Sequence, residues 1–476
     1  MIESILAAGL LAAAGPRALP DTARAMPPDS VVRAQCPGYT RLRVASIVFA
    51  GNAITKDRIL RAELDFREGD TLTVENLAKR LESNRRRLFN LQLFHTVGVQ
   101  TVCRDGALTV LFGVQERWYT FPVPIFSLAD RNIRSWLDRN DRWRRVDYGV
   151  HLVRYNFRGR NELLRGNLQL GFNQKYEVFF ENPGARHRPG LALGASLTRS
   201  RALDYQTRND RLLTYRAAAG FAVRREYVTA GLRWRNTVQR RTALDLAAYR
   251  EWIADSVRLG NPDFFRQGTT RHYLDLRLTR TFNQRNTFAY PLTGRYLQLA
   301  VAQRVYVNSN SPAFTTLFLQ AARYWALPHK LYYSIGVTSQ ARLTGKALLP
   351  YADTRALGYA TLVRGYDRYV IDGKHYAVVQ QGLSYPLLAT RRVEVGVTDN
   401  PKFSSLPLAI YLNTFVDAGY VAARQVPADN RFPNHLLASA GLGVHLVTYY
   451  DRVLTLEYTR TVTGGAGFYI RTEFPI

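Results

Sequence analysis

The feature that most constrains this chain is a period-two alternation of apolar and polar residues that runs from about Tyr119 to the C-terminus. In the segment 273–278, three leucines alternate with Tyr, Asp and Arg, and the segments 167–172 and 454–459 follow the same pattern. Successive side chains of a β-strand point to opposite faces, so these segments predict strands with one apolar and one polar face. At about 22 residues per strand and connection, the roughly 358 residues after residue 118 supply about 16 strands. We therefore expect a mainly β chain whose larger part is a transmembrane antiparallel β-barrel, because a single water-soluble sandwich is smaller.

The ends of the sequence agree with an exported membrane barrel. The segment 5–14 is a short apolar run, and Ala23-Arg24-Ala25 has the small-x-small form of a signal-peptidase site, so we expect a signal peptide over residues 1–25. After it, no stretch approaches the ~18 apolar residues that a spanning helix needs. The final strand, 468–474, alternates Phe and Ile with Tyr, Arg and Glu, as a strand between lipid and a polar lumen does.

A small α+β domain is expected before the barrel. Residues 26–40 are rich in Pro and polar residues and resemble a linker. Residues 41–118 then predict a strand at 43–49, a helix from an N-cap at Thr55 to Ala62, a helix at 74–87, and strands near 94–102 and 107–115. The barrel is expected to occupy residues 119–476.

The formal charge of +28, from 65 Lys and Arg against 37 Asp and Glu, raises the question of nucleic-acid binding. The arginines are scattered singly along alternating strands, and no zinc-finger spacing, RNA-recognition signature or basic helix is present. The pattern favours a solvated basic lumen and a rim that meets lipopolysaccharide phosphates, and we expect no nucleic-acid partner.

Two cysteines, Cys36 and Cys103, lie on either side of the predicted small domain. An oxidising periplasm permits a disulfide between them. Neither belongs to a CxxC pair or a Cys/His cluster, so two unrelated thiols are the alternative, and no metal site or cofactor is indicated.

Motifs in both parts of the chain give the sequence a recognisable resemblance. The small domain resembles a polypeptide-transport-associated (POTRA) domain, including Gly51-Asn52 after the first strand and Gly69-Asp70 between the helices. The barrel resembles the BamA/TamA family of surface-antigen-type barrels. The motifs in the barrel are a VRG(F/Y) loop motif at Val363-Arg364-Gly365-Tyr366, an FxDxG strand motif at Phe415-Val416-Asp417-Ala418-Gly419, a turn at Asn156-Phe157-Arg158-Gly159-Arg160, and a Pro-x-x-Gly strand entry at Pro291-Leu292-Thr293-Gly294.

The resemblance implies a functional loop motif (Val363, Arg364, Gly365, Tyr366) and a lumenal partner motif (Phe415, Asp417, Gly419). Alternation along 408–421 turns Asp417 into the lumen. A loop folded back inside would let the Arg364 guanidinium meet the Asp417 carboxylate as a two-pronged pair. The alternative is that this pair only braces the barrel.

The resemblance also implies a seam between the first and last barrel strands, where an incoming strand is added by β-augmentation. The presumed first strand, 121–126, contains Pro122 and Pro124, each lacking a backbone donor, and the last contains Phe474. A linker is the alternative position for these prolines.

The sequence departs from the family in three places. It has room for one POTRA domain, it ends Phe474-Pro475-Ile476 instead of on an aromatic residue, and it lacks the acidic residue expected shortly before Pro291. A specialised member of the family is therefore favoured over a subunit of a multi-component machine.

The function expected from the resemblance is that of an outer-membrane protein assembly factor that inserts or translocates polypeptides. The alternatives are a passive porin and a dedicated secretion pore for one partner protein. No metalloprotease, esterase or P-loop motif is present, and an enzyme is not expected. The expected partners are unfolded outer-membrane or secreted polypeptides, outer-membrane lipid and lipopolysaccharide, and periplasmic accessory proteins, with the small domain in the periplasm.

Overall fold

The computed structural model describes residues 36–128, 142–184, 188–237, 239–287, 290–307, 311–345, 347–394, 405–448 and 452–471. The expected signal peptide, most of the expected linker and Phe474 lie outside these residues. The described chain divides into two compact units, one with residues 36–197 and 228–242 and the other with 198–227 and 243–471. Among the described residues, no helix is long and apolar enough to cross a membrane.

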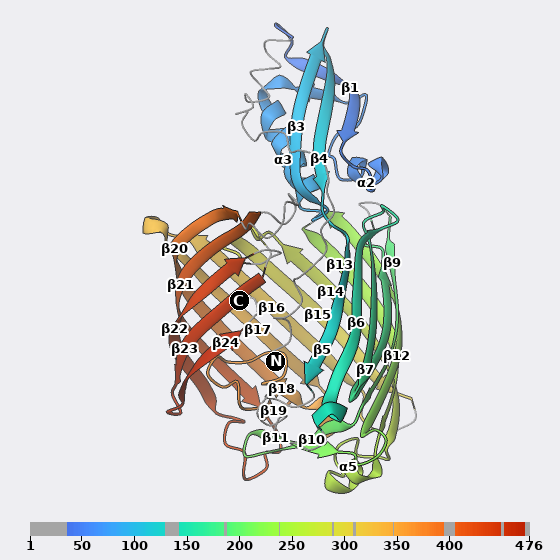
Figure 1. Ribbon diagram of the computed structural model, residues 1–476, viewed down its shortest axis with the longest axis vertical. Helices are drawn as coiled ribbons and strands as arrows, with labels where there is room; N and C mark the ends of the chain where they lie inside the picture. Colours follow the sequence, from blue (N-terminus) through green and yellow to red (C-terminus); the bar gives the residue numbers. More distant parts are fainter. Residues whose placement is uncertain are drawn as a thin grey trace. The chain divides into compact units, whose positions relative to one another are not determined.

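The N-terminal domain is a four-stranded sheet in the order β2-β1-β4-β3, with helices between its strands (Figure 1). Its elements are β1 (Arg41–Ala50), α2 (Asp57–Arg61), β2 (Thr71–Thr73), η1 (Val74–Asn76), α3 (Leu77–Phe89), β3 (Phe94–Arg104) and β4 (Ala107–Glu116). β1 and β4 pair in parallel, and the other neighbours are antiparallel. The expected order of strand, helix, helix, strand and strand is present, with the short β2 as an addition.

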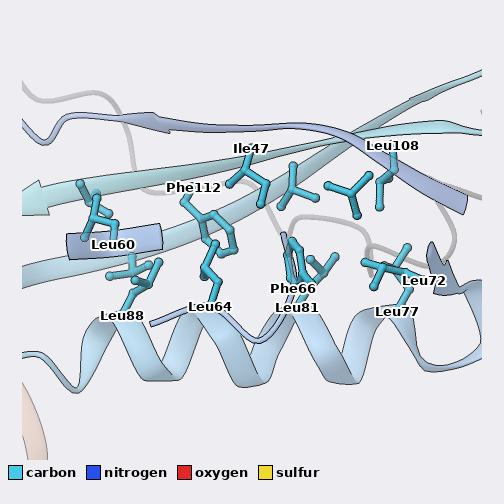
Figure 2. Packing of buried hydrophobic residues seen from close by; sticks show 14 of the residues in the cluster. Ile47, Leu60, Leu64, Phe66, Leu72, Leu77, Leu81, Leu88, Leu108 and Phe112 are labelled. Carbon is cyan, nitrogen blue, oxygen red and sulfur yellow. The ribbon is translucent and has the colours of Figure 1, made fainter. Parts of the chain in front are cut away.

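The core of this domain lies between α3 and the sheet. Leu77, Leu81 and Leu88 recur on one face of α3 and point toward Ile47 and Phe112 of the strands (Figure 2). All are almost completely buried. At about 1.5–3 kcal/mol per fully buried large apolar side chain, this face supplies much of the domain's stability.

The expected helix cap at Thr55 is wrong. The helix begins at Asp57 with Lys56 as its N-cap. The Thr55 hydroxyl is instead buried and bonded to the Glu116 carboxylate and the Tyr119 hydroxyl, because the chain brings the end of β4 alongside it.

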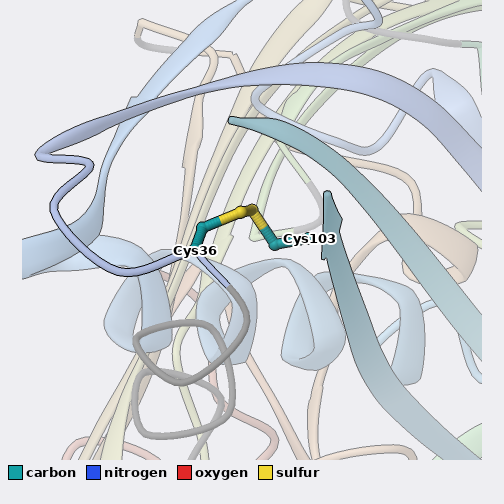
Figure 3. The surroundings of a disulfide bond; sticks show 2 residues. All are labelled: Cys36 and Cys103. Carbon is teal, nitrogen blue, oxygen red and sulfur yellow. A yellow bond between two sulfur atoms is a disulfide. The ribbon is translucent and has the colours of Figure 1, made fainter. Parts of the chain in front are cut away.

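A disulfide joins Cys36, just before β1, to Cys103 in β3 (Figure 3). The bond closes a loop with a sequence separation of 67 residues. It ties the start of the described chain to an edge strand of the domain's sheet.

The remaining strands form one sixteen-stranded sheet, in the order β24-β23-β22-β21-β20-β17-β16-β15-β14-β13-β12-β9-β8-β7-β6-β5. The expected count of about 16 antiparallel strands is confirmed. Each strand pairs with its nearest sheet neighbour along the chain, and β5 and β24 are the end strands of this order. The strands are β5 (Thr120–Leu128), β6 (Val146–Phe157), β7 (Glu162–Gly171), β8 (Asn173–Glu181), β9 (Gly190–Ser200), β12 (Val223–Thr237), β13 (Arg240–Ile253), β14 (Thr270–Asn283), β15 (Gly294–Tyr306), β16 (Phe314–Ala326), β17 (Tyr332–Leu343), β20 (His375–Glu394), β21 (Ser405–Ala422), β22 (Leu436–Thr448), β23 (Arg452–Thr461) and β24 (Ala466–Arg471).

The alternation read from the sequence appears as two faces of this sheet. In β14, Leu274 and Leu276 are exposed on one face, whereas Tyr273 and Asp275 are buried on the other. Charged side chains on the buried face are paired with one another, as Arg304 and Asp275 are. One face is thus apolar and the other is a paired polar interior.

Short elements lie in the connections between strands. They are the hairpin β10 (Ala202–Arg208) and β11 (Arg211–Arg216), helix α5 (Asp255–Gly260), the 3-10 turns η2 (Arg142–Arg145), η3 (Pro328–Lys330) and η4 (Tyr351–Asp353), and the pair β18 (Arg355–Leu357) and β19 (Ile371–Asp372). The connection between β17 and β20 contains η4, β18 and β19 and carries the Val363-Arg364-Gly365-Tyr366 motif; we call it the long loop.

Candidate functional site

The tip of the long loop is a compact turn. The Tyr366 amide donates to the Val363 carbonyl, and the Tyr369 amide donates to the Tyr366 carbonyl. At its base, β18 and β19 pair with each other. The loop therefore has its own hydrogen-bonded structure and presents the motif as a defined unit.

Arg364 projects from this tip onto Asp417 of β21. Its Nε donates to Oδ2 at 2.7 Å and its Nη2 donates to Oδ1 at 2.6 Å. The backbone amide of Arg364 also donates to Asp417 Oδ2 at 3.2 Å. Both side chains are buried, with 5% and 0% of their surface exposed. Charge-assisted bonds of this two-pronged kind fix both distance and orientation.

Two further groups complete the surroundings of the guanidinium. The Phe415 ring lies beneath it, with 3.7 Å between Cζ and the ring centroid, a cation–π contact. Glu457 of β23 accepts from Arg364 Nη1 at 3.4 Å. Arg364 thus connects the loop to two strands of the wall.

Glycines allow the close approach of loop and wall. Gly365 has φ +90°, and a Cβ there would lie 2.8 Å from the Thr459 methyl. A Cβ at Gly419 would lie 2.4 Å from Cγ2 of Val363.

Val363 and Tyr366 are buried in a hydrophobic cluster with Val378, Val421, Phe432, Leu437 and other residues of the loop and wall.

The same loop tip holds the end strand β24. Asp367 accepts from Arg471 Nε at 2.9 Å and from the Gly365 amide at 3.0 Å. The Tyr469 hydroxyl donates to the Gly365 carbonyl at 3.1 Å. Arg471 also contacts Glu457. Through these bonds, the tip fixes β24 to β23.

The network continues to the connection between β14 and β15. His445 Nε2 lies 3.2 Å from Glu457 Oε1, and its Nδ1 lies 3.0 Å from the Tyr290 hydroxyl. The Tyr290 ring stacks on Tyr411 with 4.6 Å between centroids. Tyr290 immediately precedes the Pro291 motif. The residue next to this motif therefore makes a buried contact in the site.

Sequence reasoning named Arg364 and Asp417 but missed Glu457, Arg471, Asp367 and His445. A signal for Glu457 exists, since it stands on the polar face of the alternation in 454–459. Asp367 follows the motif by one residue. The pairing of these groups depends on the register between strands, which the motif alone does not give.

The other predicted residues lie elsewhere. Pro122 and Pro124 lie inside β5, opposite Leu152 and Val150 of β6. They are therefore part of a strand and not of a linker. Within the described residues, no group of three or more His, Cys, Asp or Glu side chains could hold a metal ion.

The turn motif beginning at Asn156 contacts the N-terminal domain. Asn156 is buried, and its Nδ2 donates to the Thr55 hydroxyl at 2.8 Å, while the Lys56 amide donates to the Gly159 carbonyl at 3.0 Å. Burial raises the pKa of Tyr119 to about 12, so its hydroxyl stays protonated and donates to the Leu93 carbonyl at 2.9 Å. A second contact is the buried ion pair between Glu63 and Arg235 of β12.

Comparison with known families shows to which family the chain belongs. The Omp85 superfamily domain matches residues 156–448. The chain belongs to the Omp85 superfamily. The POTRA family, described as a surface antigen variable number repeat, matches residues 42–117, within the expected bounds of the small domain. A search of curated proteins found no match.

Solved structures of Omp85 proteins share the fold. BamA from Haemophilus ducreyi lacking POTRA domains 1–3 aligns with a TM-score of 0.54 and 15% identity, over 90% of this chain and 83% of that one. CdiB from Escherichia coli aligns with a TM-score of 0.54 and 11% identity, over 91% and 74%. CdiB from Acinetobacter baumannii aligns with a TM-score of 0.50 and 15% identity, over 90% and 74%.

Omp85 members act in outer-membrane protein insertion or secretion, and they are transporters or assembly factors, not enzymes. They are outer-membrane β-barrels with periplasmic POTRA domains. These statements describe the Omp85 superfamily, to which this chain belongs.

Proposed function

We propose that this Omp85 chain inserts or translocates polypeptides at the bacterial outer membrane by adding a strand of the substrate to the edge of β5 that lies opposite β6. Its substrates are unfolded outer-membrane or secreted polypeptides. Family membership supports the general activity, and the geometry of β5 supports the specific mechanism.

The observation that carries the proposal is the direction in which two prolines of β5 point. The Tyr155 amide donates to the Tyr119 carbonyl at 2.8 Å, immediately before β5 in the same register with β6. In an antiparallel pair, hydrogen-bonded positions alternate, so the odd-numbered residues of β5 bond to β6. Pro122 and Pro124 therefore turn their nitrogens to the opposite edge, which lacks two backbone donors.

An edge without these donors pairs weakly with any strand beside it. Each missing bond removes about 0.5–1.5 kcal/mol of net stabilisation. The loss is the same for the chain's own closing strand and for a strand of the substrate, so exchanging one for the other costs little. A strand edge that pairs weakly is a template for β-augmentation.

The Arg364 site stabilises β24, the other end strand, instead of weakening its pairing. Arg471 and Tyr469 of β24 are bonded to the loop tip, which Arg364 holds against β21 and β23. The two end strands thus differ: β24 is braced by the loop tip, whereas β5 has fewer backbone donors at the edge opposite β6.

Folding of the substrate into the membrane supplies the driving force, because the mechanism uses neither cofactor nor nucleotide. The proposed surroundings are outer-membrane lipid and lipopolysaccharide, with the POTRA domain in the periplasm. Periplasmic accessory proteins are proposed partners of that domain.

The test is reconstitution of the full chain in liposomes with an unfolded outer-membrane protein, measuring that protein's gain of protease resistance. We expect the chain to accelerate insertion and Arg364→Ala to remove most of the effect. Arg277→Ala, which changes an exposed arginine of β14, is the matched control and should insert at the parent rate. Steady ion conductance without acceleration would contradict the proposal and favour a porin or a secretion pore.

A further inference from the structure

A second residue of the long loop, Asp353, is fixed as firmly as Arg364. It ends η4, where the Tyr351 amide donates to the Asp263 carbonyl at 2.9 Å and the Ala352 amide donates to the Phe264 carbonyl at 3.2 Å. These backbone bonds attach the base of the loop to the connection between β13 and β14. They bring the Asp353 carboxylate to the wall.

The Asp353 carboxylate receives three donors from two neighbouring strands. Arg271 Nη1 of β14 lies 2.8 Å from Oδ2, and Arg304 Nη1 of β15 lies 2.6 Å from Oδ1. The Tyr306 hydroxyl also donates to Oδ2. Only 3% of the Asp353 side chain is exposed, so this carboxylate depends on its partners for charge compensation.

The two arginines are also bound by carboxylates of the wall, independently of the loop. Arg271 Nε donates to Glu251 of β13 at 2.7 Å. Arg304 forms a two-pronged pair with Asp275 at 2.8 and 2.7 Å. Together with Arg225, which pairs with Glu251, the cluster contains three arginines and three carboxylates. Removing Asp353 leaves a buried positive charge uncompensated.

The loop therefore has two anchors on different parts of the wall. Asp353 is bound to β14 and β15, whereas Arg364 is bound to β21 and β23. In the sheet order, β16, β17 and β20 lie between β15 and β21, which is about 19 Å of wall at ~4.8 Å per strand. Eleven residues separate Asp353 from Arg364, and an extended segment of that length reaches about 36–40 Å, so an anchored base confines the tip to that distance.

We infer that Asp353 is a positioning residue, which holds the base of the long loop so that its tip reaches Asp417 and Glu457. Its role in polypeptide insertion rests on the proposed function, but its role in holding the loop does not. The two can be measured separately.

The test compares Asp353→Asn with Asp263→Asn in the full chain, reconstituted in liposomes. Asp263 lies in the connection between β13 and β14, which holds the base of the loop through its backbone carbonyl. Its side chain is 72% exposed and, within the described residues, its only ion pair is with Arg266 at 3.4 Å, so it is a matched control. We expect Asp353→Asn to become cleavable by trypsin after Arg355 and Arg364, identified by fragment mass, while the parent and Asp263→Asn stay intact. Continued protection of Asp353→Asn would overturn the inference.

Heat-modifiable migration on gels establishes that each variant has a folded barrel. If Asp353→Asn fails to fold, Tyr306→Phe decides, because it removes one donor to Asp353 and keeps both ion pairs. Partial cleavage of Tyr306→Phe is expected, and full protection would overturn the inference.

The insertion assay then tests whether both anchors act through one loop. We expect Asp353→Asn combined with Arg364→Ala to insert no more slowly than Arg364→Ala alone. An additive loss in the double variant would contradict a shared role. If the parent chain itself does not accelerate insertion, the proposed function fails, whereas the protease result still decides the role of Asp353.

Discussion

The guanidinium of Arg364 and the carboxylate of Asp417 form two parallel hydrogen bonds, 2.7 and 2.6 Å long, and both side chains are buried. One group comes from a loop tip and the other from the middle of a strand. Removing either member leaves a buried charge without its partner, whereas removing both leaves Glu457 paired with Arg471. The pair therefore acts as one structural unit.

The first prediction concerns the difference in stability between single and double variants of the Arg364–Asp417 pair. Arg364→Met or Asp417→Leu alone should lower the free energy of unfolding by about 3–5 kcal/mol, because each leaves an uncompensated buried charge. The double variant should lose less than the sum of the two single losses. Urea unfolding in detergent micelles measures all four proteins. Additive losses would mean that the contact contributes little.

The second prediction concerns Gly419. Gly419→Ala should destabilise the folded barrel by about 1–3 kcal/mol, because its methyl group overlaps Val363. Combining it with Val363→Ala should recover part of the loss, since the remaining neighbours lie at 3.5 Å. Gly166→Ala in β7, whose nearest neighbour would lie at 3.9 Å, is the matched control. If Val363→Ala does not recover stability, the overlap between the new methyl group and Val363 is not the cause of the destabilisation.

Much of the fold was predictable because strand geometry imposes a period of two on the sequence. Leucines at 274, 276 and 278 reveal the outer face of β14 without any knowledge of its neighbours. The helix start at Asp57 was not predictable in this way. Thr55 has the side chain of a cap, but a distant strand end captures its hydroxyl.

The site was only partly predictable for a related reason. Arg364 and Asp417 lie in motifs that can be read locally, and the polar-face pattern indicates that Asp417 faces inward. Arg471 and Asp353 meet their partners through strand register and loop path, which depend on contacts between residues far apart in sequence. A single acidic residue in a loop has no local signal that distinguishes an anchor from a solvated side chain.

The third prediction is a pH dependence in the POTRA domain. Hydrogen bonds from Arg85 and then Arg86 lower the pKa of Glu82 in α3 to about 2. Because the folded pKa lies below the ordinary value of 4.5, the pair stabilises the domain above about pH 4.5, and this contribution is lost as the pH falls toward 2. Glu82→Gln should therefore weaken hydrogen-exchange protection of residues 77–89 at pH 7 by less than about 1 kcal/mol, because the pair is partly exposed.

The difference between Glu82→Gln and the parent should shrink at pH values below 4.5. Glu75→Gln, which changes an exposed carboxylate just before α3, is the control and should have no such effect. A difference that stays constant down to pH 2.5 would contradict the assigned cause.

The fourth prediction concerns the ion pair between Glu63 and Arg235. Both side chains are at least nine-tenths buried, and Arg235 also donates to the Gly184 carbonyl at 3.2 Å. Arg235→Gln should cost about 3–5 kcal/mol locally, detected as faster hydrogen exchange around residues 57–64. The effect should change little with salt, since buried pairs are weakly screened. Arg58→Gln on exposed α2 surface is the control, and an equal effect there would exclude a specific role for the pair.

The last prediction directly tests the edge of β5 that lies opposite β6. Pro122→Val with Pro124→Val restores two backbone donors at the edge opposite β6. If both donors find partners, closure of the seam gains about 1–3 kcal/mol, which corresponds to about a 5- to 150-fold shift toward the closed state. Insertion of an unfolded outer-membrane protein should slow accordingly, while the unfolding of the double variant in urea moves to higher concentration. Pro386→Val in β20 changes a proline away from the end strands and should leave the insertion rate unchanged. An insertion rate that the double variant leaves intact would mean that substrates do not enter at β5.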